Sequence, residues 1–187
     1  MSSVVIAGDT SGSVTLAAPS VAGTTTLTLP STSGTVLTSV SPASDLPSSI
    51  KGPTFSAYSV ASQSTSANVF LKVACGTEEW DTNSNYDNTT NYRFTPTVAG
   101  YYQVSCFVSL NATTTRLIAS IYKNGSQIKK VFDLGDVAAV SNGGGSAIVY
   151  CNGSTDYLEL YARTANANSI ISSGGETMFQ AALIRSA

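Results

Sequence analysis

The sequence of 187 residues contains no histidine, and its first fifty residues contain no lysine, arginine or aromatic residue. Because histidine is the usual general base and the commonest transition-metal ligand, its absence removes Ser-His pairs, Cys-His pairs and histidine metal centres. Only 11% of residues are charged, and no basic run is longer than Lys129-Lys130. Such a chain has few of the cationic side chains that bind nucleic acid or an anionic membrane. We therefore expect a protein that is not an enzyme, with no catalytic residues and no cofactor.

Long apolar runs and a basic leader are missing as well. The N-terminal apolar run Val4–Ala7 is too short for a signal peptide, and no run reaches transmembrane length. We expect the chain to be made and folded in a cytoplasm, where cysteines seldom form disulfides. The three cysteines stand in apolar, strand-like contexts, and we interpret them as small buried thiols: Cys75, Cys106 and Cys151.

What the N-terminal segment does contain is a repeat. A short unit beginning with glycine recurs every eleven residues, at Gly12, Gly23 and Gly34. Glycine, β-branched residues and proline at a fixed period predict short strands separated by turns, each too small to bury its own apolar face. We call residues 1–40 the arm and expect it to be ordered only against copies of itself or a partner. Its candidate anchoring residues are Val14, Leu16, Leu27 and Leu29. A β-prism, a triple β-helix and three strands laid on a neighbour all remain open.

A change of composition follows the arm. Residues 41–53 contain three prolines among small polar residues and are predicted to be a linker. Residues 54–187, which we call the knob, show period-two alternation. In the run Tyr102–Leu110 the apolar residues would share one strand face. Many short strands without a helical pattern predict an all-β sandwich or jelly roll.

Turn chemistry divides the knob into strands. Asn124-Gly125 between two apolar runs predicts a tight hairpin, because both positions of a type I′ turn require positive φ. We expect polar loops at Asp81–Asn91, Ser141–Gly145 and Thr164–Gly175, and we interpret Gly143-Gly144-Gly145 as flexible. Further strands are predicted at 55–59, 69–74, 92–94, 128–132, 147–151, 157–162 and 178–185.

Three runs carry a family resemblance: Phe94–Val104, the hairpin Tyr122–Gly125 and the closing run Phe179–Ile184. In order and spacing they resemble the C1q/TNF-like jelly roll, over roughly residues 53 to 187. The resemblance implies an antiparallel jelly-roll sandwich that forms a homotrimer. It also implies core or trimer-axis positions for Phe94, Gly100, Tyr101, Tyr102 and Phe179.

The run from Gly8 to Leu37 is similar to N-terminal stretches of tailed-bacteriophage fibre and virion surface proteins. Together, the two resemblances imply a virion surface protein: a trimeric capsid decoration or cement knob attached by its arm to the major capsid protein. The alternative is a short tail fibre or receptor-binding protein, attached to a tail or vertex protein, whose loops bind host-surface glycan or protein.

One polar loop has two interpretations. Asp81, Asn83 and Asn85 place side-chain oxygens at the first, third and fifth positions of a calcium loop. Tyr86 stands where the turn glycine belongs, and Tyr92 where the bidentate glutamate belongs. A looser calcium site and a solvated polar loop both remain open.

The knob's aromatic residues also allow two interpretations. At strand spacing they are typical of core or subunit packing, although they could instead line a carbohydrate surface. The candidate for an exposed recognition residue is Trp80. It stands within an acidic cluster made up of Glu78, Glu79, Asp81 and Asp87.

Overall fold

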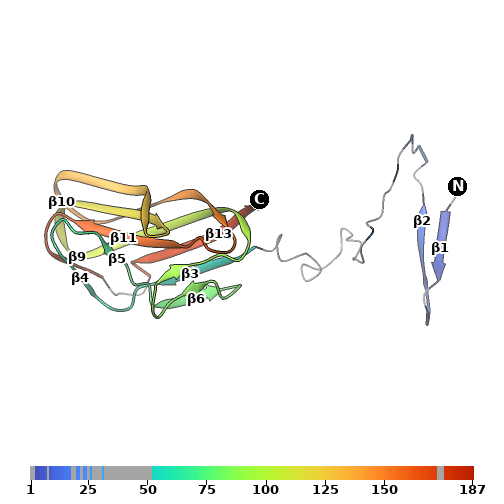
Figure 1. Ribbon diagram of the computed structural model, residues 1–187, viewed down its shortest axis with the longest axis horizontal. Coiled ribbons are helices and arrows are strands. Elements are labelled where there is room, and N and C mark those ends of the chain that lie inside the picture. The colour runs from blue at the N-terminus through green and yellow to red at the C-terminus, as the bar shows by residue number, and fades with distance from the viewer. Residues whose placement is uncertain are drawn as a thin grey trace. The chain divides into compact units, whose positions relative to one another are not determined.

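The structure is a computed structural model, and it describes residues 3–7, 9–17, 20–21, 23–24, 26, 31, 52–171 and 175–187. The chain divides into two compact units, Met1–Ser41 and Pro42–Ala187 (Figure 1). The described residues contain strands and turns but no helix, so the fold is all-β. Within these ranges no helix is long and apolar enough to cross a membrane.

In the first unit the described strands form a single hairpin. Strand β1 (Ser3–Ala7) pairs antiparallel with β2 (Ser13–Ala17), which contains the first repeat unit. Val4 lies opposite Leu16, and Ile6 lies opposite Val14. Because directly opposed residues share a face of an antiparallel pair, these four side chains form one aliphatic face, and each is more than half exposed. Leu27 and Leu29, the other candidate anchoring residues, lie outside the described residues.

The second unit is organised by two long strands, β9 (Ala99–Lys123) and β10 (Ser126–Asn152), which pair along most of their lengths (Figure 1). The sequence predicted separate short strands here. Each long strand instead runs through both halves of the sandwich. The first half of β9 pairs with β13 (Met178–Ser186), and the second half pairs with β11 (Leu158–Thr164). The two halves of β9 thus provide the centres of two strand groups.

We call the group around the first half of β9 the first sheet. Its order is β6 (Thr77–Asp81), β3 (Thr54–Tyr58), β13, the first half of β9 and the second half of β10. The second sheet contains β7 (Tyr86–Asp87), β8 (Arg93–Phe94), β11, the second half of β9 and the first half of β10. Three short strands lie beside these sheets. Strand β5 (Leu71–Lys72) pairs with β11, and β4 (Gln63–Thr65) pairs with β12 (Asn168–Ile170), which meets β9 at Leu110.

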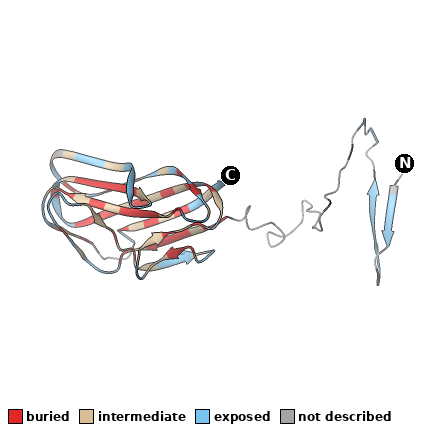
Figure 2. Cartoon of the chain, in the orientation of Figure 1, coloured by how far each residue is buried: buried red, intermediate tan, exposed pale blue. Residues whose placement is uncertain are grey.

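The core lies between the sheets, and burial alternates along the strands (Figure 2). One end is filled by stacked rings. Phe55 lies 4.5 Å from Tyr86 and 4.6 Å from Phe94, measured between ring centroids. The Tyr102 ring meets Phe94 edge-on at 5.6 Å, and its hydroxyl donates to the Val98 carbonyl. Aromatic pairs in these geometries add to the stability gained from burial alone.

All three predicted loops contain strand structure. Ser141–Gly145, including the three glycines interpreted as flexible, lies inside β10. A Cβ built on Gly144 would lie 2.1 Å from the Cys106 carbonyl oxygen, so glycine here permits close approach of two backbones. The loop predicted at Thr164–Gly175 contains β12, and that predicted at Asp81–Asn91 contains β7.

The connection between β9 and β10 is a two-residue turn. Asn124 and Gly125 occupy it with φ angles of 53° and 78°. Both values lie in the left-handed region that asparagine and glycine tolerate. The Asn124 amide donates to the Asp156 carboxylate, and its carbonyl oxygen accepts the Tyr157 N–H, so the turn is bound to the chain before β11.

Candidate assembly interface

The outward face of the first sheet carries large apolar side chains at the end nearest the C-terminus. On β9, Tyr102 faces the core, and its neighbour Tyr101 faces outward with 47% of its surface exposed. Tyr101 lies opposite Tyr150 of β10, with ring centroids 5.5 Å apart. Ile148, two residues before Tyr150, is 57% exposed. Strand pleating therefore places three large apolar side chains together on the solvent side of the sheet.

Strand β13 extends this apolar area. Ile184 is 54% exposed, and it lies near a register shift between Leu183 and Arg185. Tyr101, Ile148, Ile184 and the last three residues line an open hollow of about 650 Å³. Contiguous exposed apolar groups of this kind mark interaction surfaces in soluble proteins. We call Tyr101, Ile148, Tyr150 and Ile184 the apolar face.

Beyond the apolar face the same sheet presents a small polar belt. Register places Ser105 of β9 beside Ser146 and Gln180, and Gln180 beside Ser56 of β3. The Gln180 amide donates to the Ser56 hydroxyl at 2.9 Å, and that hydroxyl donates to the Glu79 carboxylate. Gln180, Ser56 and Glu79 therefore satisfy hydrogen bonds with one another across β13, β3 and β6.

The residues proposed for the core or the trimer axis separate in the structure. Phe94, Tyr102 and Phe179 are fully buried in the core, whereas Tyr101 belongs to the apolar face. Gly100 is buried where β9 meets β13, and a Cβ there would lie 2.4 Å from the Arg185 carbonyl oxygen. The core residues therefore stabilise the sandwich, and Tyr101 is the member of the set available for subunit contact.

The sequence analysis missed Ile148 and Ile184. The signal for Ile148 was present, because Val149 and Cys151 face the core while Ile148 and Tyr150 face outward. A strand that is apolar on both faces is typically covered on both faces. The signal at Ile184 was hidden by the register shift in β13, which breaks the alternation on which such a prediction depends.

The candidate calcium residues are engaged in a turn. Asp81 accepts the backbone N–H groups of Asn83 and Tyr86 at 3.2 and 2.6 Å. The Asn83 side-chain oxygen accepts the Thr82 hydroxyl, and that of Asn85 accepts the Thr97 N–H. Among the described residues no group of three or more His, Cys, Asp or Glu side chains could hold a metal ion. These oxygens stabilise the chain between β6 and β8.

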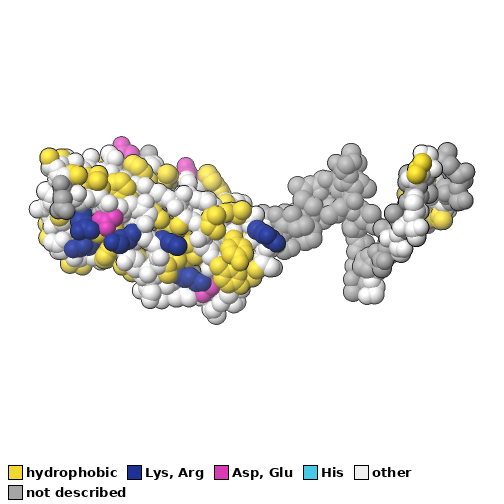
Figure 3. Space-filling model, turned by 90° about the horizontal axis from the view of Figure 1, so that it is seen from above, with side chains coloured by type: hydrophobic (Ala, Val, Ile, Leu, Met, Phe, Trp, Pro, Cys, Tyr) yellow, Lys and Arg dark blue, Asp and Glu magenta, His cyan; other side chains and the backbone are white. Residues whose placement is uncertain are grey.

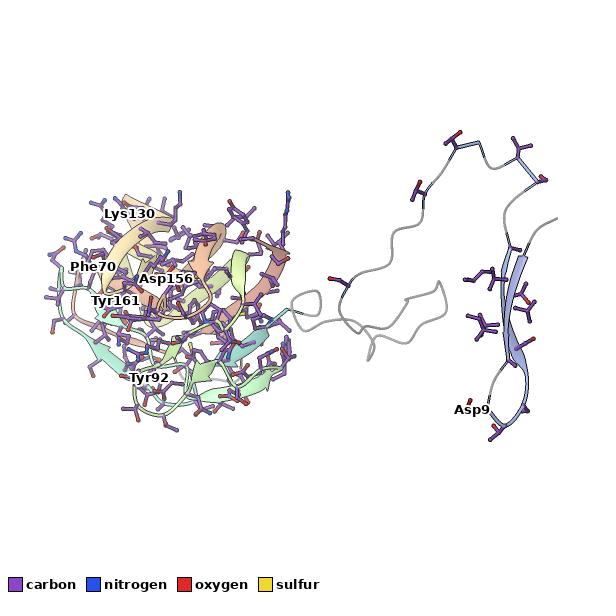
Figure 4. All side chains as sticks on the ribbon, turned by 45° about the vertical axis from the view of Figure 1, so that its right-hand side comes forward. Asp9, Phe70, Tyr92, Lys130, Asp156 and Tyr161 are labelled. Carbon is purple, nitrogen blue, oxygen red and sulfur yellow. The ribbon has the colours of Figure 1, made fainter. Side chains whose placement is uncertain are left out.

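The aromatic residues of the second sheet pack on one another and on cations. Tyr122 and Tyr161 stack at 3.9 Å, and Phe70 lies 5.9 Å from Tyr122 (Figure 4). The Arg163 guanidinium covers Phe70, and the Arg93 guanidinium lies 4.5 Å above the Tyr157 ring. Ring faces occupied in this way form cation–π and stacking contacts within the knob. They favour packing over carbohydrate binding.

Buried thiols add no nucleophile. The three cysteines are free, and burial raises the pKa of Cys75, Cys106 and Cys151 to about 12. Because the thiolate is the reactive form, these thiols are inert at neutral pH. Their role is to fill space in the core, as the sequence predicted.

No family model matches the chain, and no curated protein matches it in sequence. Solved structures do match. Murine APRIL is similar over 71% of this chain and 98% of its own, with 13% identity and a TM-score of 0.54. The globular domain of zebrafish complement 1qA protein is similar over 73% and 99%, with 16% identity and a TM-score of 0.54. The fold is a TNF/C1q-like jelly roll.

A further similar structure is the PRD1 vertex protein P5, with 18% identity and a TM-score of 0.49 over 72% of this chain and 98% of that one. The fold predicted from the three sequence runs is confirmed by the first two likenesses. Within this TNF/C1q-like sandwich, the exposed apolar face is the candidate surface for contact with a partner.

Proposed function

We propose that the chain is a non-enzymatic structural protein of a bacteriophage virion surface, in which three knobs associate and the arm attaches them to the shell. The observation that carries the assembly step is the apolar face. Burial of apolar surface stabilises a contact between copies by about 25 cal/mol for each Å² removed from water. Trimers are typical of TNF/C1q-like domains, and three copies meeting about one axis would cover Tyr101, Ile148 and Ile184.

The virion assignment is supported by the first unit. A two-stranded hairpin is marginally stable alone in water, yet β1 and β2 expose a wholly aliphatic face without a lysine or arginine. Such a segment gains stability when it docks on another protein, so folding and attachment are coupled. The likeness of this segment to phage fibre and virion surface proteins supports a dock on the virion, and we propose the major capsid protein as that dock.

The length of the arm favours a decoration protein over a receptor-binding fibre. Fifty extended residues span at most about 170 Å, and folding into hairpins shortens this reach. The alternative, a short tail-fibre protein that binds host glycan or protein, is supported by Trp80, which is 48% exposed on β6. The number of copies per particle distinguishes the two, because a shell position is repeated far more often than a tail position.

If copies associate through the apolar face, the single substitution Ile148→Asp should convert the trimer into monomers. Ile148→Asp places a carboxylate in the centre of the apolar face, where burial against another subunit would leave the charge unpaired. Because Ile148 is 57% exposed in the single chain, the knob itself should still fold. We expect the variant to sediment at the 19.2 kDa chain mass, whereas the wild type sediments at three times that mass.

Val69→Asp is the matched control. Val69 is 54% exposed and lies between β4 and β5, away from the apolar face. This variant should sediment with the wild type. If Ile148→Asp also kept the wild-type mass with an unchanged melting temperature, the apolar face would not be the contact between copies.

A further inference from the structure

Two of the edge strands in the described part of the knob carry opposite charge. Strand β6 pairs only with β3, and β10 pairs only with β9 among the described residues, so each leaves one side unpaired. Strand β6 carries Glu78, Glu79 and Asp81 and no cation. The first part of β10, from Ser126 to Phe132, carries Lys129 and Lys130 and no carboxylate. We call these the acidic edge and the basic edge.

The acidic edge lacks a counter-charge within its own chain. Among the described residues none of its three carboxylates forms an ion pair. Burial, and then the charge of Asp81, raises the pKa of Glu78. Trp80 lies between Glu79 and Asp81 with 48% of its surface exposed. Exposed tryptophans are enriched among the residues that carry the binding energy of interfaces.

The basic edge has one lysine that forms no ion pair among the described residues. Lys130 shares Asp133 with Arg116, but Lys129 is exposed and has no carboxylate partner among the described residues. Ile128 and Leu134 on the same strand are 38% and 40% exposed. Figure 3 shows lysine and arginine side chains spaced along the face of the knob viewed from above, with an acidic side chain beside those at one end.

Charge on a free strand edge often serves only to prevent edge-to-edge aggregation. That role is met by either sign, and it does not require an exposed tryptophan. Opposite signs on the two edges do more: they make like edges repel and unlike edges attract. A chain with two different, complementary surfaces associates head to tail, and such contacts close into a ring when the rotation between neighbours closes. The acidic edge lies on β6 of the first sheet, and the basic edge lies on the first part of β10, which belongs to the second sheet.

We infer that the acidic edge of one knob, with Glu78 and Trp80, docks on the basic edge of the next copy, with Lys129. The partner is a second copy of this chain. This inference rests on the proposed association of knobs and specifies which surfaces meet. Contact between unlike edges fixes the direction of the ring, while the apolar face supplies burial at its centre.

A charge swap tests the inference in the full chain. Glu78→Lys and Lys129→Glu each turn an unlike contact into a like one, and neither native side chain has an ion-pair partner among the described residues. We expect each single variant to dissociate at a concentration about tenfold higher than the wild type. The double variant E78K/K129E restores both the attraction and the wild-type net charge, so its dissociation should return to within about threefold of the wild type.

Sedimentation velocity over a concentration series gives the dissociation constants, and thermal melting checks that each variant is folded. A wild type that forms trimers, with single variants equally tight, would overturn the edge contact and leave the proposed association standing. Weakened single variants with no recovery in the double variant would also overturn it. A wild type that sediments as a monomer at all concentrations would overturn both proposals.

Discussion

We expect deletion of residues 1–40 to yield a soluble knob that no longer joins virus particles. The knob retains its two sheets and its core, because the compact unit from Pro42 to Ala187 contains every strand of the sandwich. What is lost is the aliphatic face of the β1–β2 hairpin, formed by Val4, Ile6, Val14 and Leu16. Burial of one such side chain is worth about 1.5 kcal/mol or more. Without four of them, attachment should fall below detection when particles are incubated with the truncated chain and repurified.

A point variant separates loss of that face from loss of the segment. Leu16→Asp places a charge on the aliphatic face, whereas Thr15→Asp places the same charge on the other face of the same strand, opposite Val5. We expect Leu16→Asp to abolish attachment and Thr15→Asp to retain it. Equal attachment by the truncated chain and the full chain would show that the arm is not the anchor.

The second large effect is on folding. Gly144→Ala should destabilise the knob by about 3 kcal/mol, at the upper end of what overpacking costs. The added Cβ would lie 2.1 Å from the Cys106 carbonyl oxygen and 2.7 Å from the Phe107 Cα. Both atoms belong to the backbone of β9, which cannot move aside without breaking its pairing with β13. In thermal denaturation this corresponds to a melting temperature lower by roughly 10 °C.

Gly76→Ala is the matched control for this variant. A Cβ on Gly76 would have its closest contact at 3.6 Å, an ordinary van der Waals distance, and its φ is not positive. The same substitution should therefore change the melting temperature by a few degrees at most. Similar melting temperatures for the two variants would mean that the glycines of β10 are not required by close backbone approach.

The sequence predicted the sandwich because its strongest local signals agreed with the tertiary structure. Tyr102, Val104 and Cys106 alternate with polar residues and are all buried on one face of β9. Asn124-Gly125 predicts a type I′ turn, because few other residue pairs accept two positive φ angles. Where a local pattern has a single physical solution, the sequence is sufficient.

Other features depend on contacts that the local sequence does not record. Three consecutive glycines normally indicate a loop, but Gly143, Gly144 and Gly145 lie in β10 because Phe132, β9 and Val131 approach their backbone closely. Strands β9 and β10 each run through both sheets, so the short predicted strands merge. Ile184 was missed for a related reason: the alternation there is broken by a register shift that only the pairing reveals.

The oxygens of the candidate calcium loop illustrate how one pattern allows two outcomes. Alternating Asp81, Asn83 and Asn85 can surround a cation, but they can equally accept N–H groups from a tight turn. In the structure Asp81 takes two backbone N–H groups and Asn85 takes one. Spacing alone does not separate these cases, because the deciding contacts come from Tyr86 and Thr97.

The most direct test of a trimeric virion surface protein is its copy number in purified particles, measured by quantitative mass spectrometry against the major shell subunit. If the chain is a capsid decoration protein, its copy number should be a multiple of three and comparable with that of the shell subunit. A small multiple of three would favour the tail-fibre alternative and a receptor-binding role. Absence of the chain from purified particles would contradict the virion assignment altogether.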